Sequence, residues 1–117
     1  MPYCCLTTNV AMNPQGTTEL AEKLSHFLED ILGKPEKWIM VQMETGKNLL
    51  FGGSNCPAAY CELKSIGLPL ERCNEMSKAL CEFLWKEARI EQDRVYINFT
   101  DLKRAYFGWN GKTFGTM

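Results

Sequence analysis

The 117-residue chain contains a single histidine, His26, and none of its six cysteines belongs to a C-x-x-C pair. Structural zinc sites and thioredoxin-like redox centres are built from closely spaced cysteines and histidines. The sequence therefore favours neither kind of site, and we expect no metal and no cofactor. His26 falls outside the apolar stripe of its predicted helix, so we expect its side chain to be exposed to solvent.

Charge of one sign is not concentrated anywhere in the chain. The 13 basic and 14 acidic side chains give a net charge of −1, and like charges form no blocks. Nucleic-acid binding needs a clustered basic surface, and binding to anionic membranes commonly uses a polybasic segment. We therefore expect neither nucleic acid nor a membrane among the partners.

Long apolar runs are also lacking. No run approaches the roughly 20 residues that a membrane-spanning helix needs, and the first residues do not show the charged and apolar regions of a signal peptide. We therefore expect a cytoplasmic protein, with secretion by a route that uses no signal peptide as the alternative. In such a protein the cysteines are expected to be thiols that are mostly buried.

The composition is that of an ordinary globular protein, with 45% hydrophobic and 23% charged residues. A chain of this length is large enough for one hydrophobic core and too small for two. We therefore predict one domain over residues 1–117.

The pattern of elements is strand, helix, strand, repeated once. Tyr3 and Cys4 are matched by Tyr60 and Cys61 at an offset of 57 residues, which indicates a duplicated βαβ unit. The expected strands are residues 2–8, 36–44, 58–67 and 94–101.

Two amphipathic helices connect these strands. The first is expected to begin at Thr17 or Thr18 as N-cap and to end at Gly33, because glycine followed by proline stops a helix. The second is expected to begin at Asn74. The apolar residues that define the two helical faces are Leu20, Leu24, Phe27, Leu28, Ile31, Leu32, Met76, Leu80, Phe83 and Leu84.

Right-handed βαβ crossovers place both helices on one face of a single sheet. The fold class is therefore α+β, a four-stranded mixed sheet with two helices on one face. In the last strand, Val95, Ile97 and Phe99 should face the helices, which leaves Tyr96 and Asn98 on the uncovered face. A sheet with an uncovered face and free edges usually associates with a partner, so we expect oligomerisation.

Three glycine-containing segments admit two interpretations each. Lys34, within the helix stop, either complements the helix dipole or serves a site. The segment at 51–55 resembles a phosphate-binding loop but lacks the following Lys and Ser/Thr, which favours a turn. Asn-Gly at 110–111 predicts a hairpin, in which Trp109 and Phe114 are either core residues or the wall of a pocket.

Several motifs occur in one order along nearly the whole chain. They are Pro2 after the first methionine, NV at 9–10, GKP at 33–35, FGGS at 51–54, SIG at 65–67, DRVYINF at 93–99 and GWNGKTFG at 108–115. Together they resemble the family of macrophage migration inhibitory factor and D-dopachrome tautomerase, within the tautomerase superfamily.

The resemblance implies a trimeric, barrel-like assembly of βαβ-βαβ subunits with three active sites at the subunit boundaries. It implies keto–enol tautomerisation of small aromatic α-keto acids such as phenylpyruvate, or of dopachrome-like compounds. In this chemistry Pro2 is the acid and base, and it needs a free amino group, which requires removal of Met1. Lys34 and the backbone N–H of Ile66 would hold the substrate. The other substrate-binding residues that the resemblance implies are Ser65, Tyr96, Asn98, Trp38, Phe107, Trp109 and Phe114.

Some positions differ from the vertebrate members of this family. Trp38 replaces a tyrosine and Phe107 replaces a smaller aliphatic residue, so we expect a narrower pocket. Ala58 replaces the first cysteine of a C-x-x-C pair and leaves Cys61 alone, so thiol-oxidoreductase activity is not expected. The alternative function is that of a cytokine-like signalling protein, in which the pocket belongs to a receptor-binding surface.

Overall fold

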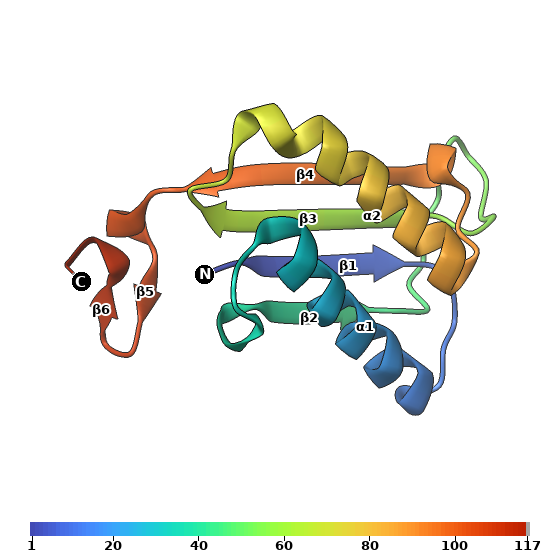
Figure 1. The fold of residues 1–117 in the computed structure, drawn as a ribbon. Coiled ribbons are helices and arrows are strands. Elements are labelled where there is room, and N and C mark those ends of the chain that lie inside the picture. Colours follow the sequence, from blue (N-terminus) through green and yellow to red (C-terminus); the bar gives the residue numbers. More distant parts are fainter. Residues whose placement is uncertain (117) are drawn as a thin grey trace.

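The structure is a computed structural model, and it describes residues 1–116. Two helices, α1 (Pro14–Leu32) and α2 (Cys73–Ala88), cover one face of a four-stranded sheet (Figure 1). The strands follow the spatial order β2 (Met40–Glu44), β1 (Tyr3–Thr8), β3 (Ala59–Ile66) and β4 (Val95–Leu102). The predicted α+β class and the placement of both helices on one face are confirmed.

The sheet consists of two parallel pairs joined through its centre. β1 is parallel to β2, β3 is parallel to β4, and β1 and β3 are antiparallel. Two matching βαβ units therefore meet at their first strands. Cys4 and Cys61, which the repeat relates, lie with their sulfur atoms 3.4 Å apart.

The core fills the space between the sheet and the helices. Leu28 of α1 and Leu63 of β3 are fully buried, and the rings of Phe27 and Phe83 stack at 4.7 Å between their centres. Val95, Ile97 and Phe99 pack against this core, as their alternation predicts. The buried residues that form it are Cys4, Leu6, Leu20, Leu24, Leu28, Ala59, Cys61, Leu63, Leu80, Leu84 and Ile90.

Within residues 1–116, the cysteines form no disulfide bond. All six cysteines are free thiols, of which Cys4, Cys61 and Cys81 are buried and Cys56 is exposed. Neither helix of residues 1–116 combines the length and apolar character that crossing a membrane requires.

Helix α1 begins earlier than predicted. Its N-cap is Asn13, whose side chain accepts a hydrogen bond of 2.7 Å from the amide of Gly16, and Pro14 occupies the first turn. The prediction of Thr17 or Thr18 was wrong because apolar periodicity starts only at Leu20, whereas the Asn-Pro pair marks the true start. The helix ends at Gly33 in a left-handed conformation, as predicted.

Helix α2 was also predicted to begin at the wrong residue. Asn74 lies inside the helix, which starts at Cys73 directly after a 3-10 turn, η2 (Leu70–Arg72). The N-cap position, Arg72, makes no side-chain capping bond. The preceding turn already directs the chain into the helix, so no Asn cap is used at this end.

The second predicted strand, residues 36–44, is shorter in the structure. Residues Glu36–Trp38 form a 3-10 turn, η1, and the strand begins only at Met40. The carboxylate of Glu29, on α1, accepts a hydrogen bond of 2.8 Å from the amide of Glu36 and stabilises this turn. Trp38 is therefore not part of the sheet alternation.

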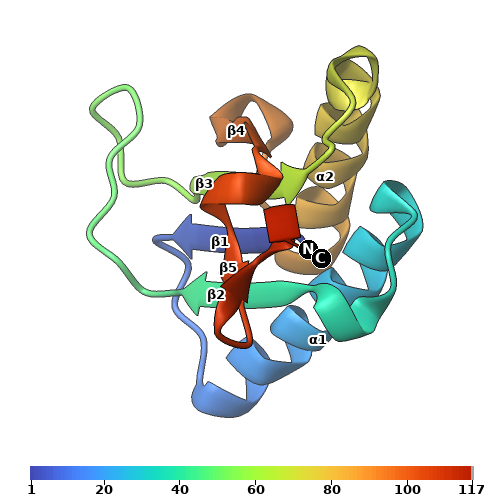
Figure 2. The same ribbon diagram turned by 90° about the vertical axis from the view of Figure 1, so that its left-hand side faces the viewer.

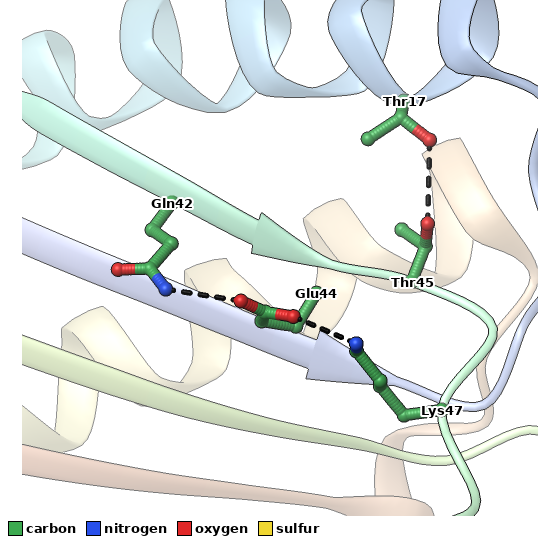
Figure 3. Close-up of polar contacts among 5 residues, drawn as sticks. All are labelled: Thr17, Gln42, Glu44, Thr45 and Lys47. Carbon is green, nitrogen blue, oxygen red and sulfur yellow. Dashed lines mark hydrogen bonds and ion pairs between the residues drawn. The ribbon is translucent and has the colours of Figure 1, made fainter.

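The edge strand β2 shows which face of the sheet is uncovered (Figure 3). Glu44 accepts a hydrogen bond of 3.1 Å from Gln42 and pairs with Lys47 at 3.0 Å, on the side away from the helices. These two donors hold the pKa of the Glu44 carboxyl below its usual range. Thr45 points the other way, with its hydroxyl 3.3 Å from that of Thr17 on α1.

The loop between β2 and β3 is held by two side chains from outside it. Asn9 donates to the carbonyls of Leu49, Asn55 and Cys56 and accepts from the amide of Ala58. The guanidinium of Arg94 donates to carbonyl oxygens at four positions of the same loop, with distances of 2.9 to 3.3 Å. Within the loop, Phe51 and Ser54 are bridged around two glycines with positive φ. The segment at 51–55 is therefore a turn.

Replacing Arg94 with lysine is expected to lower the free energy of unfolding by about 2 kcal/mol, because one ammonium cannot replace several charge-assisted hydrogen bonds. Urea unfolding followed by circular dichroism measures this. Arg72→Lys is the matched control, since Arg72 makes one 3.4 Å contact, to the exposed Glu75, and should cost less than about 0.5 kcal/mol. Equal losses in the two variants would contradict the role of Arg94.

Candidate active site

A cavity of about 210 Å³ lies at the end of the sheet where β1 and β2 begin. The C-terminal segment lies across this end, beside the amino terminus (Figures 1 and 2). The cavity is lined by Met1, Pro2, Tyr3, Trp38, Met40, Phe107, Gly108, Trp109 and Phe114.

A short hairpin builds one wall of the cavity. Strands β5 (Gly108–Trp109) and β6 (Lys112–Thr113) are joined by Asn110 and Gly111, both with positive φ, which is the geometry of the predicted Asn-Gly turn. The hairpin is flanked by two 3-10 turns, η4 (Arg104–Tyr106) and η5 (Phe114–Thr116). The amide of Phe114 donates to the carbonyl of Phe107 at 2.9 Å and closes this unit.

The aromatic side chains of the wall contact one another. The rings of Trp38 and Trp109 meet edge to face at 4.8 Å, and Phe114 lies 6.2 Å from each of them. Phe114 is buried, whereas Trp109 is 48% exposed. Three aromatic rings from two distant segments of the sequence therefore line one apolar space.

Pro2 forms part of the cavity lining and is less than 2% exposed. Its carbonyl accepts a hydrogen bond of 3.0 Å from the amide of Met40, which fixes the start of β1 against β2. Met1 lies half-buried in the same cavity. Removal of Met1 would therefore leave the amino group of Pro2 at the cavity surface.

Lys34 lies beside this amino terminus. Its ammonium donates a hydrogen bond of 2.7 Å to the carbonyl of Ile66 at the end of β3, and the hydroxyl of Ser65 lies 3.4 Å from the same oxygen. Burial, then the charge of Lys34, then that of Arg104 hold the pKa of the Met1 amino group below its usual value. A lowered pKa leaves more of this amine neutral, and so basic, at neutral pH.

The structure brings most of the predicted site residues to this end of the sheet. Pro2, Trp38, Phe107, Trp109 and Phe114 line the cavity, and Lys34, Ser65 and Ile66 form the polar group next to it.

Two predicted site residues, Tyr96 and Asn98, lie away from the cavity. Tyr96 and Asn98 are exposed on the sheet face away from the helices, as the alternation of β4 predicts. Tyr96 is 66% exposed and packs against Phe51, with 4.8 Å between ring centres. Within one chain, therefore, Tyr96 and Asn98 do not join the cavity.

Sequence reasoning missed two side chains that line the cavity and one residue that supports its wall. Tyr3 and Met40 are paired across β1 and β2, and both line the cavity. Arg104 donates to the carbonyl of Phe114 at 3.2 Å. Tyr3 and Met40 could have been found only from the register of the parallel pair, because neither residue belongs to a recognisable motif.

The chain was then compared with known proteins. The family described as Macrophage migration inhibitory factor matches residues 1–115. The chain belongs to the macrophage migration inhibitory factor family. It is 39% identical over 115 residues to Macrophage migration inhibitory factor of Xenopus tropicalis, covering 97% of this chain and 99% of that relative. It is 36% identical over 116 residues to the Macrophage migration inhibitory factor homolog of Brugia malayi, covering 98% and 100%.

Solved structures of this family share the fold. The crystal structure of the macrophage migration inhibitory factor homologue from Prochlorococcus marinus superposes with a TM-score of 0.88 at 36% identity, covering 97% of this chain and 99% of that one. The structure of the Macrophage Migration Inhibitory Factor from Trichinella spiralis gives 0.87 at 33% identity, covering 96% and 99%. The predicted membership of the tautomerase superfamily is thereby confirmed.

One group of side chains outside the cavity has metal-ligating chemistry. The ligand atoms of His26, Glu29 and Glu36 lie within 4.8 Å of one another. His26 is 77% exposed, as predicted, and its Nδ1 lies 3.2 Å from the carboxylate of Glu36, while Glu29 already caps the amide of Glu36. These contacts explain the group as a structural link between α1 and η1, and we assign it no metal.

Proposed function

We propose that this member of the family is a keto–enol tautomerase of aromatic α-keto acids such as phenylpyruvate, and that dopachrome-like compounds also fit its cavity. The acid and base is Pro2 after removal of Met1. The observation that carries the proposal is the position of Pro2, which lies buried at the floor of an aromatic cavity.

The proposed reaction moves one proton between oxygen and carbon. In the direction from enol to keto form, the neutral amine of Pro2 takes the proton from the enol oxygen, and the resulting ammonium gives a proton to C3, the carbon next to the keto group. In the reverse direction the neutral amine removes a proton from C3 and the oxygen receives it. General acid–base catalysis is most efficient when the pKa of the group lies near the working pH. Burial and the charge of Lys34 lower the pKa of the Met1 amino group, and we expect the same causes to lower the pKa of the Pro2 amine once Met1 is removed.

Lys34 would bind the negative charge of the substrate. Its ammonium, held at the carbonyl of Ile66, would contact the carboxylate or the enolate oxygen that develops during proton transfer. A cation fixed in a partly dehydrated site stabilises such charge more than water does. The rings of Trp38, Trp109 and Phe114 would hold the aromatic part of the substrate and exclude water.

We further propose that the active form is a homotrimer. The sheet face that carries Tyr96 and Asn98 is uncovered within one chain, and Tyr96 is 66% exposed. A neighbouring subunit would cover this face, and Tyr96 and Asn98 would then contribute to the neighbour's cavity. The site would be complete only in the assembly.

Retention of Met1 is expected to abolish the activity. Protein whose chain starts at Pro2 should convert phenylpyruvate enol, whereas protein that keeps Met1 should be at least about 100-fold slower, because its proline nitrogen is an amide and cannot accept a proton. Enol absorbance measures the rate, and intact mass identifies the terminus of each preparation.

Both preparations should melt at the same temperature and have the same mass by light scattering. Equal rates from the two forms would refute Pro2 as the acid and base. Inactivity of both forms on every aromatic α-keto acid would refute the tautomerase function.

A cytokine-like role is the second candidate function. Large side chains are exposed around the cavity, with Tyr106 at 85% and Trp109 at 48%, so the rim offers a surface for a protein receptor. The family to which the chain belongs takes its name from macrophage migration inhibitory factor. A cellular response that is retained by a catalytically inactive Pro2→Gly variant would favour this role over catalysis.

A further inference from the structure

Arg104 is tied to both phenylalanines of the cavity wall. Its Nε donates to the carbonyl of Phe114 at 3.2 Å, and its own carbonyl accepts from the amide of Phe107 at 3.3 Å. The turn that follows is packed closely, because a Cβ added at Gly115 would lie 3.0 Å from the Cα of Ala105. Arg104 does not itself line the cavity, but it is held against the backbone of two residues that do.

The guanidinium of Arg104 still has donors to offer. Its Nε is used by Phe114, and within residues 1–116 its two terminal nitrogens have no hydrogen-bond or ion-pair partner. The residue is exposed at the surface. A guanidinium presents a planar pair of N–H donors that matches the two oxygens of a carboxylate.

The side chains of the C-terminal segment that contains Arg104 carry a net positive charge, although the whole chain carries −1. Beyond Asp101 the sequence contains Lys103, Arg104 and Lys112 and no Asp or Glu. The charges of Lys34 and Arg104 both act on the amino terminus inside the cavity. Two cations therefore lie near the cavity, Lys34 at the carbonyl of Ile66 and Arg104 at the carbonyl of the wall residue Phe114.

We propose that Arg104 is a second anion-binding residue, and that the cavity prefers aromatic α-keto acids whose ring carries a second carboxylate. This inference rests on the proposed function of the same site. Lys34 would bind the α-keto carboxylate and Arg104 the carboxylate on the ring. The preference for the diacid would follow because Lys34 and Arg104 could each bind one of its carboxylates.

The test compares (4-carboxyphenyl)pyruvate with phenylpyruvate as substrates. The native chain should favour the diacid in kcat/KM by about 10- to 100-fold, the range expected for a hydrogen bond to a charged group. Arg104→Gln should remove this preference, with a rise in KM that is larger for the diacid than for phenylpyruvate. Arg104→Lys, which keeps the charge without the fork, should retain part of it.

Lys103→Gln is the matched control, because it removes the same charge from the neighbouring residue and should leave the preference unchanged. Equal losses on both substrates in Arg104→Gln would mean that Arg104 only supports the wall, and would overturn the inference. An unchanged preference in Arg104→Gln would overturn it as well.

A binding measurement separates this inference from the proposed catalysis. Quenching of Trp38 and Trp109 fluorescence reports binding of 3-(4-carboxyphenyl)propanoate and of 3-phenylpropanoate, neither of which can tautomerise. If no α-keto acid is converted but the diacid binds more tightly in an Arg104-dependent way, the proposed function fails and the inference holds. Equal binding of both probes to the native chain overturns the inference.

Discussion

Replacing Pro2 with glycine is expected to lower kcat/KM for phenylpyruvate enol by about 100-fold or more, the contribution of one well-placed acid–base group. Glycine keeps a terminal amine but loses the ring that holds the nitrogen in one position. Pro2 is less than 2% exposed, and its carbonyl is bonded to Met40, so the ring fixes the nitrogen against a rigid sheet. The loss should therefore appear mainly in kcat. The measurement is the initial rate of enol loss by absorbance.

The control for this variant is Cys5→Ser, on the same strand. Cys5 is half-buried on β1 and does not line the cavity, so its replacement should leave kcat/KM within about twofold. Both variants should unfold cooperatively, which calorimetry checks. A Pro2→Gly protein with native kcat would show that the proton is carried by another group.

Much of the fold could be predicted from hydrophobic periodicity. The alternation of Val95, Ile97 and Phe99 and the apolar stripes of both helices fixed the face on which the helices pack, because each pattern fits only one secondary structure. The boundaries were less predictable. The start of α1 depends on one side-chain bond from Asn13 and the start of β2 on a carboxylate of Glu29, and periodicity carries no record of such contacts.

The candidate site was predicted from motifs, and the structure divides those motifs into two groups. Pro2, Lys34 and Trp109 belong to the cavity or its edge. Asn9 and Arg94, from the NV and DRVYINF motifs, instead hold the loop that places Phe51 against Tyr96. These two residues act as scaffold for the face that we propose to meet a second subunit.

The remaining cavity residues could not be predicted, because they depend on pairing between distant segments. Met40 reaches the cavity through its register with Tyr3, and Arg104 supports the cavity wall through its bond to the carbonyl of Phe114. Neither contact leaves a local pattern in the sequence. From the sequence, Trp109 and Phe114 could be either core residues or the wall of a pocket. The structure supports both interpretations, since Phe114 is buried while Trp109 is partly exposed.

Replacing Lys34 with methionine is expected to raise KM for phenylpyruvate by about 10- to 100-fold, the effect of removing one charge-assisted hydrogen bond to the substrate. Methionine keeps the length of the side chain and removes its charge. Lys34 is one of the groups that hold the pKa of the Met1 amino group low, and we expect it to act in the same way on the amine of Pro2 after Met1 is removed. Its loss therefore raises that pKa and shifts the rising limb of the pH profile of kcat/KM to higher pH.

The pH profile and a control variant together distinguish a direct effect of Lys34 on the amine from a general loss of positive charge. The base form of the amine exists above its pKa, so activity in the direction that needs the neutral amine grows as pH rises through that value. Lys37→Met removes an equal charge three residues away, from a side chain 5.4 Å from the centre of the Trp38 ring. This control should leave both KM and the profile near those of the native protein. A rising limb that stays in place in Lys34→Met, or moves equally in Lys37→Met, would exclude direct action of Lys34 on the catalytic amine.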